Sequence, residues 1–401
     1  MLRNKQNDID MSSNKNIPQL RFPEFTGEWE KKNLGKVIDV SKGQQVNRTE
    51  LTEDTTMFPM LNGGSTPSGY YTKFNTPSDS ITISEGGNSC GYINYMKVPF
   101  WAGGHCYVVK PLFDINKKFI YHALKYNEPN IMRLRVGSGL PNIQRKTLLN
   151  EAYLFYPSEP SEQKKIAEFL SAMDDMIEAQ GQRVEALKEK KKGLMQQMFP
   201  QKGETTPQLR FPEFTGEWIE KKMGDSFEER IEKNRVDLPL LSLGEEGLFL
   251  QSETARKDNS NSDKSKYLRV AIGDIAYNTM RMWQGRCVYS CIEGIVSPAY
   301  TVCIPNDNVD SMFHYYLFKT QRMINIFHMH SQGLVSDTLN LKYGAFAKIA
   351  YCLPPTLVEQ KKIAECLSAM DDVIASETAK LDALKEHKKG LMQQMFPQPT
   401  K

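Results

Sequence analysis

Side chains that can contact base edges and phosphates gather in two separate segments of the chain, residues 30–158 and 219–355. Arginine and lysine suit guanine, asparagine and glutamine suit adenine, and all four also reach backbone phosphates. The candidates are Gln44, Asn47, Arg48, Lys73, Asn88, Arg135, Asn142, Gln144, Arg145 and Lys146 in the first segment, and Arg256, Lys257, Asn278, Arg281, Gln284, Arg286, Asn340 and Lys342 in the second. A single residue of this kind is more often a solvated surface group. Together, the two sets predict two nucleic-acid-binding surfaces.

The densest group of these residues is the run from Arg281 to Arg286, which reads Arg-Met-Trp-Gln-Gly-Arg. One interpretation is that Arg281 and Gln284 make bidentate contacts with bases. The other is that they pack beside Trp283, and the sequence favours neither. Glycine-rich turns such as Asn62-Gly63-Gly64 would let the backbone approach a duplex.

Motifs for catalysis are missing from the sequence. It has no GxxxxGKS/T phosphate loop and no Asn-Pro-Pro-aromatic or Asp-Pro-Pro-Tyr tetrapeptide of amino-methyltransferases. The Leu-Pro-Pro-Thr run at residues 353–356 is a linker before a helix. We therefore expect a protein that catalyses no reaction by itself and binds neither a cofactor nor a metal.

The cysteines indicate a reduced, cytoplasmic protein, because there are 7 of them, an odd number, without a CxxC pair. The nearest approach to a metal pattern is Cys287, Cys291 and Cys303 with His328 and His330, and we favour buried structural thiols there. No apolar signal core opens the chain, and no run approaches the roughly 18 apolar residues of a membrane span. A net charge of +3 permits a polyanionic partner without requiring one.

Two stretches of the chain occur twice. Residues 18–29 and 207–218 both read PQLRFPEFTGEW, and residues 162–200 return with few changes as residues 359–397. The segments between the repeats show no obvious likeness to each other. This pattern predicts one duplicated scaffold that carries two different binding domains.

The longer repeat has apolar residues at most a and d positions of a heptad that begins at Gln163. It predicts two helices of about 40 residues, or ~60 Å each, which end at Pro200 and Pro397. Thr356 and Glu359 have the spacing of a capping box at the start of the second helix. Helices of this length outreach a domain of about 150 residues, so we expect them to pair, and the chain order favours antiparallel pairing with a pseudo-two-fold axis.

The variable segments are predicted to be mixed α/β domains, which makes the whole an α+β fold. Their β-prone runs are residues 80–84, 92–95, 106–109, 151–156, 268–277, 287–290 and 299–304. Helical pieces at residues 118–126 and 311–328 hold corresponding places, so the two segments are expected to share a fold. The predicted bounds are a disordered tail at 1–17, domains at 18–158 and 207–355, long helices at 159–200 and 356–397, and a linker at 201–206.

Three motifs together resemble the specificity subunit of type I restriction-modification enzymes. They are the duplicated Pro-Gln-Leu-Arg-Phe-Pro-Glu-Phe segment, the Glu-Gln-Lys-Lys-Ile-Ala-Glu opening of each helix, and Gly-Ile-Val-Ser-Pro-Ala-Tyr at residues 294–300. Arg-Met-Trp-Gln-Gly at residues 281–285 also looks like a motif of the family's target-recognition domains, and the first domain has no match to it. The resemblance implies two target-recognition domains, each specific for half of a bipartite asymmetric DNA site, and helices that set their spacing.

The resemblance also implies the partners. They are double-stranded DNA, two modification (methyltransferase) subunits and two restriction (ATP-dependent translocase and endonuclease) subunits, with no membrane. S-adenosylmethionine, ATP and magnesium would then be bound by those subunits. A modification-only complex is an alternative within the same family. A single-chain nuclease or methyltransferase would need motifs that are missing, and a coiled-coil adaptor without DNA would not explain why the domains differ while the scaffold repeats.

Overall fold

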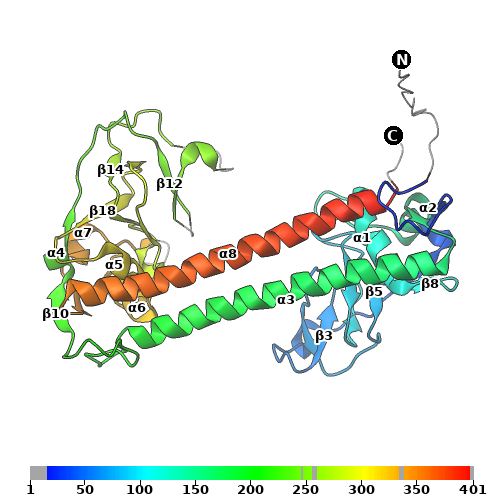
Figure 1. Cartoon of the computed structure of the whole chain (residues 1–401), viewed down its shortest axis with the longest axis horizontal. Coiled ribbons are helices and arrows are strands. Elements are labelled where there is room, and N and C mark those ends of the chain that lie inside the picture. The colour runs from blue at the N-terminus through cyan, green and yellow to red at the C-terminus, as the bar shows by residue number, and fades with distance from the viewer. Residues whose placement is uncertain (1–15, 245–246, 255–259, 334–337, 398–401) are drawn as a thin grey trace, which may run out of the picture. The chain divides into compact units, whose positions relative to one another are not determined.

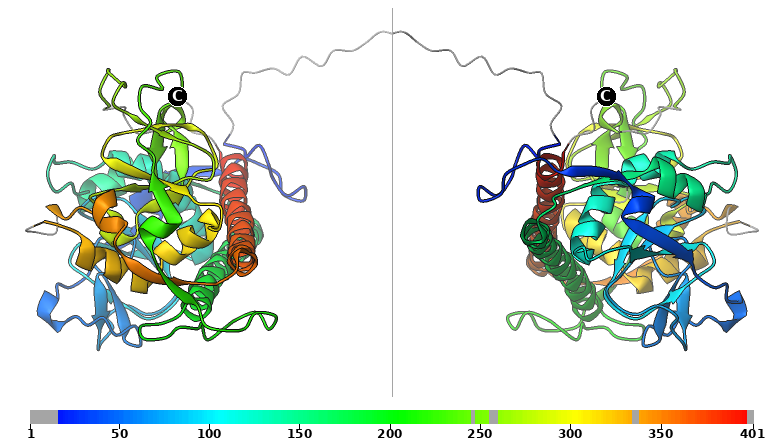
Figure 2. Two further views of the ribbon diagram at one scale, coloured as in Figure 1. Left: turned by 90° about the vertical axis from the view of Figure 1, so that its left-hand side faces the viewer. Right: turned by 90° about the vertical axis from the view of Figure 1, so that its right-hand side faces the viewer.

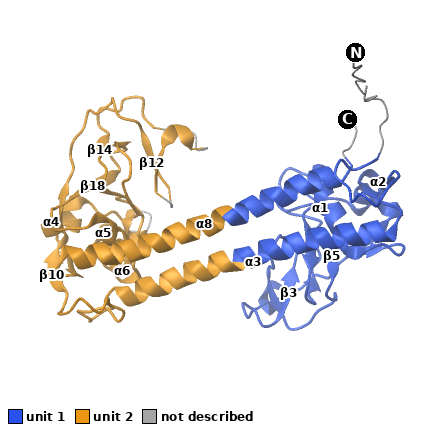
Figure 3. Cartoon of the chain, in the orientation of Figure 1, with its two compact units in different colours: residues 1–181, 380–401 blue, residues 182–379 orange. Residues whose placement is uncertain are grey.

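The computed structural model (Figure 1) describes residues 16–244, 247–254, 260–333 and 338–397. The chain forms two compact units (Figure 3): unit 1 comprises residues 1–181 and 380–401, and unit 2 comprises residues 182–379. The long helices α3 (Pro160–Met198) and α8 (Leu357–Met395) are each divided between the units, with one part in unit 1 and the other in unit 2. Their 39 residues confirm the predicted length. Within the described ranges, no helix is long and apolar enough to cross a membrane. The predicted tail at 1–17 lies almost wholly outside the described residues.

Unit 1 is built around a four-stranded antiparallel sheet in the order β2-β8-β5-β6. A three-stranded sheet, β4-β3-β7, and the antiparallel pair β1-β9 complete its strands among the described residues. The elements are β1 (Glu30–Asn33), β2 (Ile38–Lys42), β3 (Phe58–Leu61), β4 (Gly69–Tyr71), β5 (Ser80–Ser84), β6 (Ile93–Met96), β7 (Trp101–Ala102), β8 (Cys106–Pro111), α1 (Lys117–Arg133), α2 (Arg145–Glu151) and β9 (Tyr153–Tyr156), with the short 3-10 helices η1 (Leu34–Lys36) and η2 (Arg48–Glu50).

The described residues of unit 2 form a four-stranded antiparallel sheet in the order β11-β18-β15-β16 and three strand pairs, β10-β19, β12-β13 and β14-β17. Its elements are β10 (Ile219–Lys222), α4 (Met223–Ser226), β11 (Phe227–Glu229), β12 (Leu241–Leu243), β13 (Leu248–Leu250), η3 (Gln251–Glu253), β14 (Leu268–Val270), β15 (Ile275–Asn278), η4 (Met282–Gln284), β16 (Cys287–Tyr289), β17 (Gly294–Val296), β18 (Tyr300–Pro305), α5 (Ser311–Phe318), α6 (Gln321–His330), α7 (Tyr343–Phe346) and β19 (Ala350–Leu353).

The two units share a topology although their sequences differ. If the strands of each four-stranded sheet are numbered 1 to 4 along the chain, their spatial order is 1-4-2-3 in both units. A helix follows each sheet. Its N-cap side chain, Asn116 or Asp310, accepts a hydrogen bond from the backbone N–H of the residue three positions later. The backbone N–H of each cap residue donates to the first glutamine of a long helix, Gln163 or Gln360. The expectation of a common fold is confirmed.

The halves of the two long helices run antiparallel within each unit. In unit 1, Lys388, late in α8, forms an ion pair with Asp174, early in α3. In unit 2, Lys191 Nζ lies 2.5 Å from an oxygen of Asp371, so a late residue of α3 again meets an early one of α8. The end views show the two helix halves on one flank of the strand-rich part of each unit (Figure 2).

The short repeat forms what we call a clasp in each unit, residues 18–29 and 207–218. In unit 1, Arg21 donates two hydrogen bonds of 2.7 Å to the carboxylate of Glu162, and Trp29 Nε1 donates a third at 3.3 Å. The N–H of Leu20 also donates to the carbonyl of Gln394 at 2.9 Å. The clasp thereby joins the start of α3 to the end of α8.

Unit 2 repeats this geometry with the helices exchanged. Arg210 donates to Glu359 at 2.7 and 2.8 Å, and Trp218 Nε1 donates at 3.3 Å. The N–H of Leu209 donates to the carbonyl of Gln197 at 2.9 Å. Both glutamates are only 1 % exposed, so each is a buried charge held by its arginine.

The end of each long helix closes the core of a unit. Phe396, just after α8, meets Trp29 edge-on at 5.8 Å between ring centroids in unit 1. Phe199, just after α3, meets Trp218 at 6.3 Å in unit 2. All four rings are buried, together with the preceding Met395 and Met198.

The predicted strands and helices lie where the structure has them, but α1 continues to Arg133, beyond the predicted 126, and three junctions differ. The run at 268–277 forms two strands, because the chain turns at Gly273 and the buried Asp274 accepts hydrogen bonds from Arg230. The helical run at 311–328 forms α5 and α6, because Thr320 caps a new helix. The run at 151–156 begins inside α2, and its strand starts at Tyr153.

Candidate nucleic-acid interface

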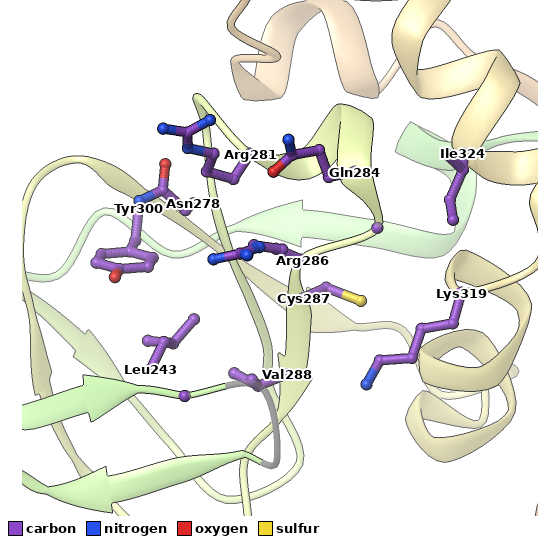
Figure 4. Close-up of a pocket in the computed structure, with 12 residues that line it drawn as sticks. Leu243, Asn278, Arg281, Gln284, Arg286, Cys287, Val288, Tyr300, Lys319 and Ile324 are labelled. Atoms are coloured by element: carbon purple, nitrogen blue, oxygen red, sulfur yellow. The ribbon is translucent and has the colours of Figure 1, made fainter. Parts of the chain in front are cut away.

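A cavity of about 630 Å³ in unit 2 brings four of the predicted side chains together. The turn between β15 and β16 supplies most of them, and helical residues close another side (Figure 4). The lining residues are Leu243, Gly244, Asn278, Arg281, Gln284, Gly285, Arg286, Cys287, Val288, Tyr300, Lys319 and Ile324. We call this the base cavity, because its polar side chains are of the types that can contact base edges.

Apolar anchors fix the turn that carries Arg281 and Gln284. Met282 is fully buried, and Trp283 Nε1 donates to the carbonyl of Met280 at 3.0 Å. The Trp283 ring also meets the ring of His328 on α6 edge-on at 5.7 Å. Packing at this turn is therefore provided by Met282 and Trp283, while Arg281 and Gln284 are exposed at the cavity.

The turn depends on a glycine. Gly285 follows η4 with φ of +74°, in the left-handed region that favours glycine. A Cβ at this position would lie 2.9 Å from Cδ1 of Ile324 on α6. The reversal at Gly285 places Gln284 and Arg286 on either side of it, and both side chains line the base cavity.

The base cavity is positively charged. Among the described residues, its lining contains Arg281, Arg286 and Lys319 and no acidic residue. Lys319 Nζ donates to the neutral hydroxyl of Tyr315 at 2.7 Å and lies 4.1 Å from that ring's centroid. A polyanion that presents hydrogen-bonding base edges fits this combination of charge and amide groups.

The other predicted residues of unit 2 lie outside the base cavity. Asn340 forms a β-bridge with Gln332 and donates to its carbonyl at 3.0 Å. Lys342 is exposed just before α7. Arg256 and Lys257 lie outside the described residues. Contact of any of these residues with DNA stays a prediction.

Unit 1 has a smaller cavity of about 290 Å³ beside the loop after β2. Of the predicted residues, Arg48 lines it, together with Gln45, Val46, Leu51, Met60, Asn62 and Ser68. The side chains of Lys73, Asn88, Arg135, Gln144 and Lys146 are exposed elsewhere on the unit. Unit 1 therefore does not gather its predicted residues as unit 2 does.

Some predicted side chains of unit 1 already have protein partners. Arg145 forms an ion pair with Asp39 and donates from Nε to the carbonyl of Val40 at 3.0 Å. The backbone N–H of Val40 and then Arg145 hold the pKa of Asp39 below its usual value. Asn47 donates to Glu50 at 3.0 Å.

Backbone groups fix two further predicted residues. The carbonyl of Gln44 accepts a hydrogen bond from Trp101 Nε1 at 2.8 Å. The backbone of Asn142 pairs with that of Val136 at 2.9 and 3.0 Å. Both side chains are on the surface, so DNA contact through them stays a prediction.

Sequence reasoning missed several residues at these sites. Tyr300 reaches the base cavity because it pairs with Asn278 across β18 and β15, and Lys319 reaches it from the end of α5. Elsewhere in unit 1, outside the lining of the smaller cavity, Glu85 accepts from Lys42 at 2.7 Å and from His105 at 2.9 Å. Burial opposes ionisation of Glu85, but these two donors outweigh it and lower its pKa. Tyr300 ends the Gly-Ile-Val-Ser-Pro-Ala-Tyr motif, which was the available signal for it.

The cysteines behave mainly as structural thiols. Cys90, Cys106, Cys287 and Cys303 are buried, and burial raises the pKa of Cys287 to about 12. Cys291 is exposed, unlike its two neighbours in the candidate metal pattern. The described ranges contain no group of three or more histidine, cysteine or acidic residues arranged to hold a metal ion.

Comparison with known proteins assigns the chain to a family. Residues 26–189 and 216–386 match the type I restriction modification DNA specificity domain, so the chain belongs to this family and carries its domain twice. A Mycoplasma genitalium protein described as a type I specificity subunit is 24% identical over 93% of this chain and 94% of its own length. The Methanocaldococcus jannaschii type I restriction enzyme MjaVIII specificity subunit is 22% identical over 94% of this chain and 93% of its own.

Solved structures agree on the fold. The crystal structure of a type I restriction-modification S subunit from M. genitalium has a TM-score of 0.64 at 19% identity, covering 96% of this chain and 100% of that chain. A chain from a study of assembly and conformational transition in the type I system has a TM-score of 0.51 at 13% identity, covering 93% and 98%. The predicted fold class, two mixed domains with two long helices, is confirmed.

Proposed function

We propose that this protein gives a type I restriction-modification complex its DNA sequence specificity, and that each of its two domains recognises one half of a bipartite, asymmetric site. The observation that carries the proposal is the convergence of Asn278, Arg281, Gln284 and Arg286 on one cavity, whose described lining residues include no acidic one. The shared sheet order of the two units supports two domains with the same task. Their different loops support different half-sites.

The long helices set the spacing between the half-sites in this proposal. Each helix contributes to both units, so its length constrains both. Removing one heptad shortens a helix by ~10.5 Å, which is about 3 bp of B-DNA, and also changes its angular phase. Genome-wide methylation mapping of such a variant should give unchanged half-sites around an altered spacer, or no methylation. An unchanged spacer with full activity would contradict the role of the helices.

In this proposal the partner subunits supply the catalytic activities of the complex. Two modification subunits would bring S-adenosylmethionine and methylate adenine, and two restriction subunits would bring ATP and magnesium for translocation and cleavage. The repeated clasps and adjoining helix faces are the proposed docking places, and their duplication favours two modification subunits per chain. A modification-only complex would methylate the same site without cleaving unmodified DNA, so a cleavage assay separates the two arrangements.

The base cavity provides the direct test. Arg281→Ala and Gln284→Ala, each in the full chain with its modification subunits, should weaken recognition of one half-site by about 1–3 kcal/mol per lost bidentate contact. Lys348→Ala is the control, because Lys348 is exposed and does not line the cavity. Methylation mapping should show one half of the motif relaxed and the other unchanged. Changes in both halves, or none, would contradict the assignment of these residues.

The non-catalytic assignment has its own test. The isolated chain should neither methylate nor cleave DNA, and it should direct methylation only after the modification subunit and S-adenosylmethionine are added. Methyl transfer by the rigorously purified chain alone would overturn the proposal. A complex with one modification subunit per chain would refute the symmetry argument only.

A further inference from the structure

A second cavity of unit 2, of about 670 Å³, lies along the last turns of α3. Five cations line it: Lys188, Lys191 and Lys192 from α3, and Lys319 and Arg322 from the junction of α5 and α6. The remaining described lining residues are glutamine, threonine and apolar residues, and none of them is acidic. We call this cavity the α3 groove.

The acidic partners of these lysines lie outside the groove. Lys188 pairs with Glu185 at 2.8 Å and Lys192 with Glu189 at 3.7 Å, both between residues three apart on the exposed helix surface. Such surface pairs contribute little, so the ammonium groups can turn to a phosphate at small cost. Lys191 is less available, because it pairs with Asp371 at 2.5 Å and is largely covered.

The other two cations have neutral partners. Lys319 donates to the Tyr315 hydroxyl. Arg322 Nη1 donates to the backbone carbonyls of Pro200 at 2.9 Å and Gln201 at 3.0 Å. Arg322 is thereby held in place, and it offsets the partial negative charge at the end of α3. No ion pair with a carboxylate is found for either cation within the described residues.

At the counterpart place in unit 1, described residues fill the space that the groove takes in unit 2, although the end of the helix has the same sequence. The end of α8 repeats Lys-Lys-Gly-Leu-Met-Gln-Gln-Met-Phe-Pro from the end of α3. Alignment of the N-caps Asn116 and Asp310 sets Tyr126 opposite Thr320. The Tyr126 ring stacks on Phe396 at 5.0 Å with 16° between the planes, and the cavity there has only about 10 Å³.

At this counterpart place in unit 1, the positive charge of the lysine is neutralised by a nearby carboxylate. Lys125, the counterpart of Lys319, pairs with Glu128 at 2.6 Å. The groove in unit 2 therefore results from residues of its variable domain, which replace an aromatic filler and an ion pair by an open, positively charged surface. This ties the groove to the domain that carries the base cavity.

Lys319 connects the two cavities of unit 2, because it lines both the base cavity and the α3 groove. We propose that the α3 groove holds the sugar-phosphate backbone of the duplex whose bases enter the base cavity. The inference rests on the proposed function and adds a second, sequence-independent DNA contact to it. The cations of the groove, with no acidic residue among its described lining residues, match a polyphosphate chain in sign.

The repeat supplies a matched pair of variants for the test. Lys188→Gln/Lys192→Gln removes two charges at the groove. Lys385→Gln/Lys389→Gln removes the corresponding charges of α8, which pair in the same way with Asp382 at 3.5 Å and Glu386 at 3.2 Å. Each variant is prepared in the full chain with its modification subunits. The affinity for a duplex that contains the methylated motif is then measured from about 50 to 200 mM salt.

The groove pair should bind DNA with a shallower salt dependence. Loss of two phosphate contacts lowers the slope of log K against log salt by about 1.8, so the unaltered complex should lose about tenfold more affinity over this range than the variant. The recognised sequence should stay the same, and the α8 pair should keep the unaltered slope. Arg322→Gln should act in the same direction, and Arg322→Lys, which keeps the charge, should restore most of the slope.

Three results would overturn the inference. Equal slopes for the unaltered complex and the groove pair would mean that no phosphate is bound there. Weaker assembly with the modification subunit, without a change of slope, would mean that the groove holds an acidic protein surface. Absence of sequence-specific binding by the unaltered complex would overturn the proposed function, and this inference with it.

Discussion

Arg210→Met should destabilise unit 2 by removing the cation from a buried carboxylate. Glu359 is 1 % exposed and accepts hydrogen bonds of 2.7 and 2.8 Å from Arg210. The substitution keeps the apolar stem and leaves Glu359 with the Trp218 N–H at 3.3 Å. Breaking a buried ion pair by removing one partner costs about 3–5 kcal/mol. We expect a loss of that size in the free energy of unfolding of unit 2.

The duplicated clasp allows the loss to be located. Arg21→Met should have an effect of the same size on unit 1, because Glu162 has matching bonds of 2.7, 2.7 and 3.3 Å. Urea unfolding gives the size, and hydrogen exchange read by mass spectrometry gives the place. Exchange should rise at residues 207–218 and at the start of α8 for Arg210→Met, and at residues 18–29 and the start of α3 for Arg21→Met.

A double substitution separates the ion pair from general damage. Arg210→Met/Glu359→Leu removes both charges, and replacing a buried pair by apolar residues is often neutral. The double variant should therefore recover most of the stability that Arg210→Met loses. A loss below about 1 kcal/mol for Arg210→Met would mean that the pair behaves as an exposed one, and the clasp would not be what joins the helix ends.

Three further outcomes can be checked. Gly285→Ala should cost about 1–2 kcal/mol, because φ of +74° strains any residue with a Cβ, and calorimetry should show the lowered stability together with weaker DNA binding. Burial lowers the pKa of His314 to about 4, so between pH of about 6.5 and 4 the unfolded chain binds a proton that the folded chain does not. His314 should therefore lower the free energy of unfolding by about 1.4 kcal/mol for each unit by which the pH falls in that window, and His314→Gln should make the urea midpoint less dependent on pH. Exchange of residues 30–158 for the equivalent segment of a relative should change one half of the methylated motif, and a change in both halves would contradict independent recognition.

Local pattern predicted the scaffold better than it predicted the contacts. The heptads and terminal prolines determined α3 and α8, because each helix is specified by its own sequence. The clasp was not predicted, because Arg21 and Glu162 lie 141 residues apart and only folding joins them. At the second helix the expected capping box is half formed: the N–H of Glu359 donates to Thr356 at 3.3 Å, but its carboxylate binds Arg210.

In the candidate site, too, residues close together in the sequence could be predicted, and residues brought together by folding could not. Arg281, Gln284 and Arg286 could be predicted because one short turn carries them all. Tyr300 and Lys319 could not, since strand register and the end of α5 bring them to the cavity. In unit 1 the prediction relied on residue type alone, and the protein itself binds Arg145 and Asn47.

The Met-Phe pair at the end of α8 has a consequence for the order in which the chain folds. Trp29 and Phe119, made early, pack against Phe396, which is synthesised 277 residues after Phe119. At synthesis rates of about 5–20 residues per second, the core of unit 1 stays without the Phe396 ring for many seconds. The core that contains Trp218 has no such delay, because Phe199 precedes it. The domain that is translated first is therefore the one completed last, and a nascent chain released early would expose the aromatic core of its first domain to chaperones and proteases.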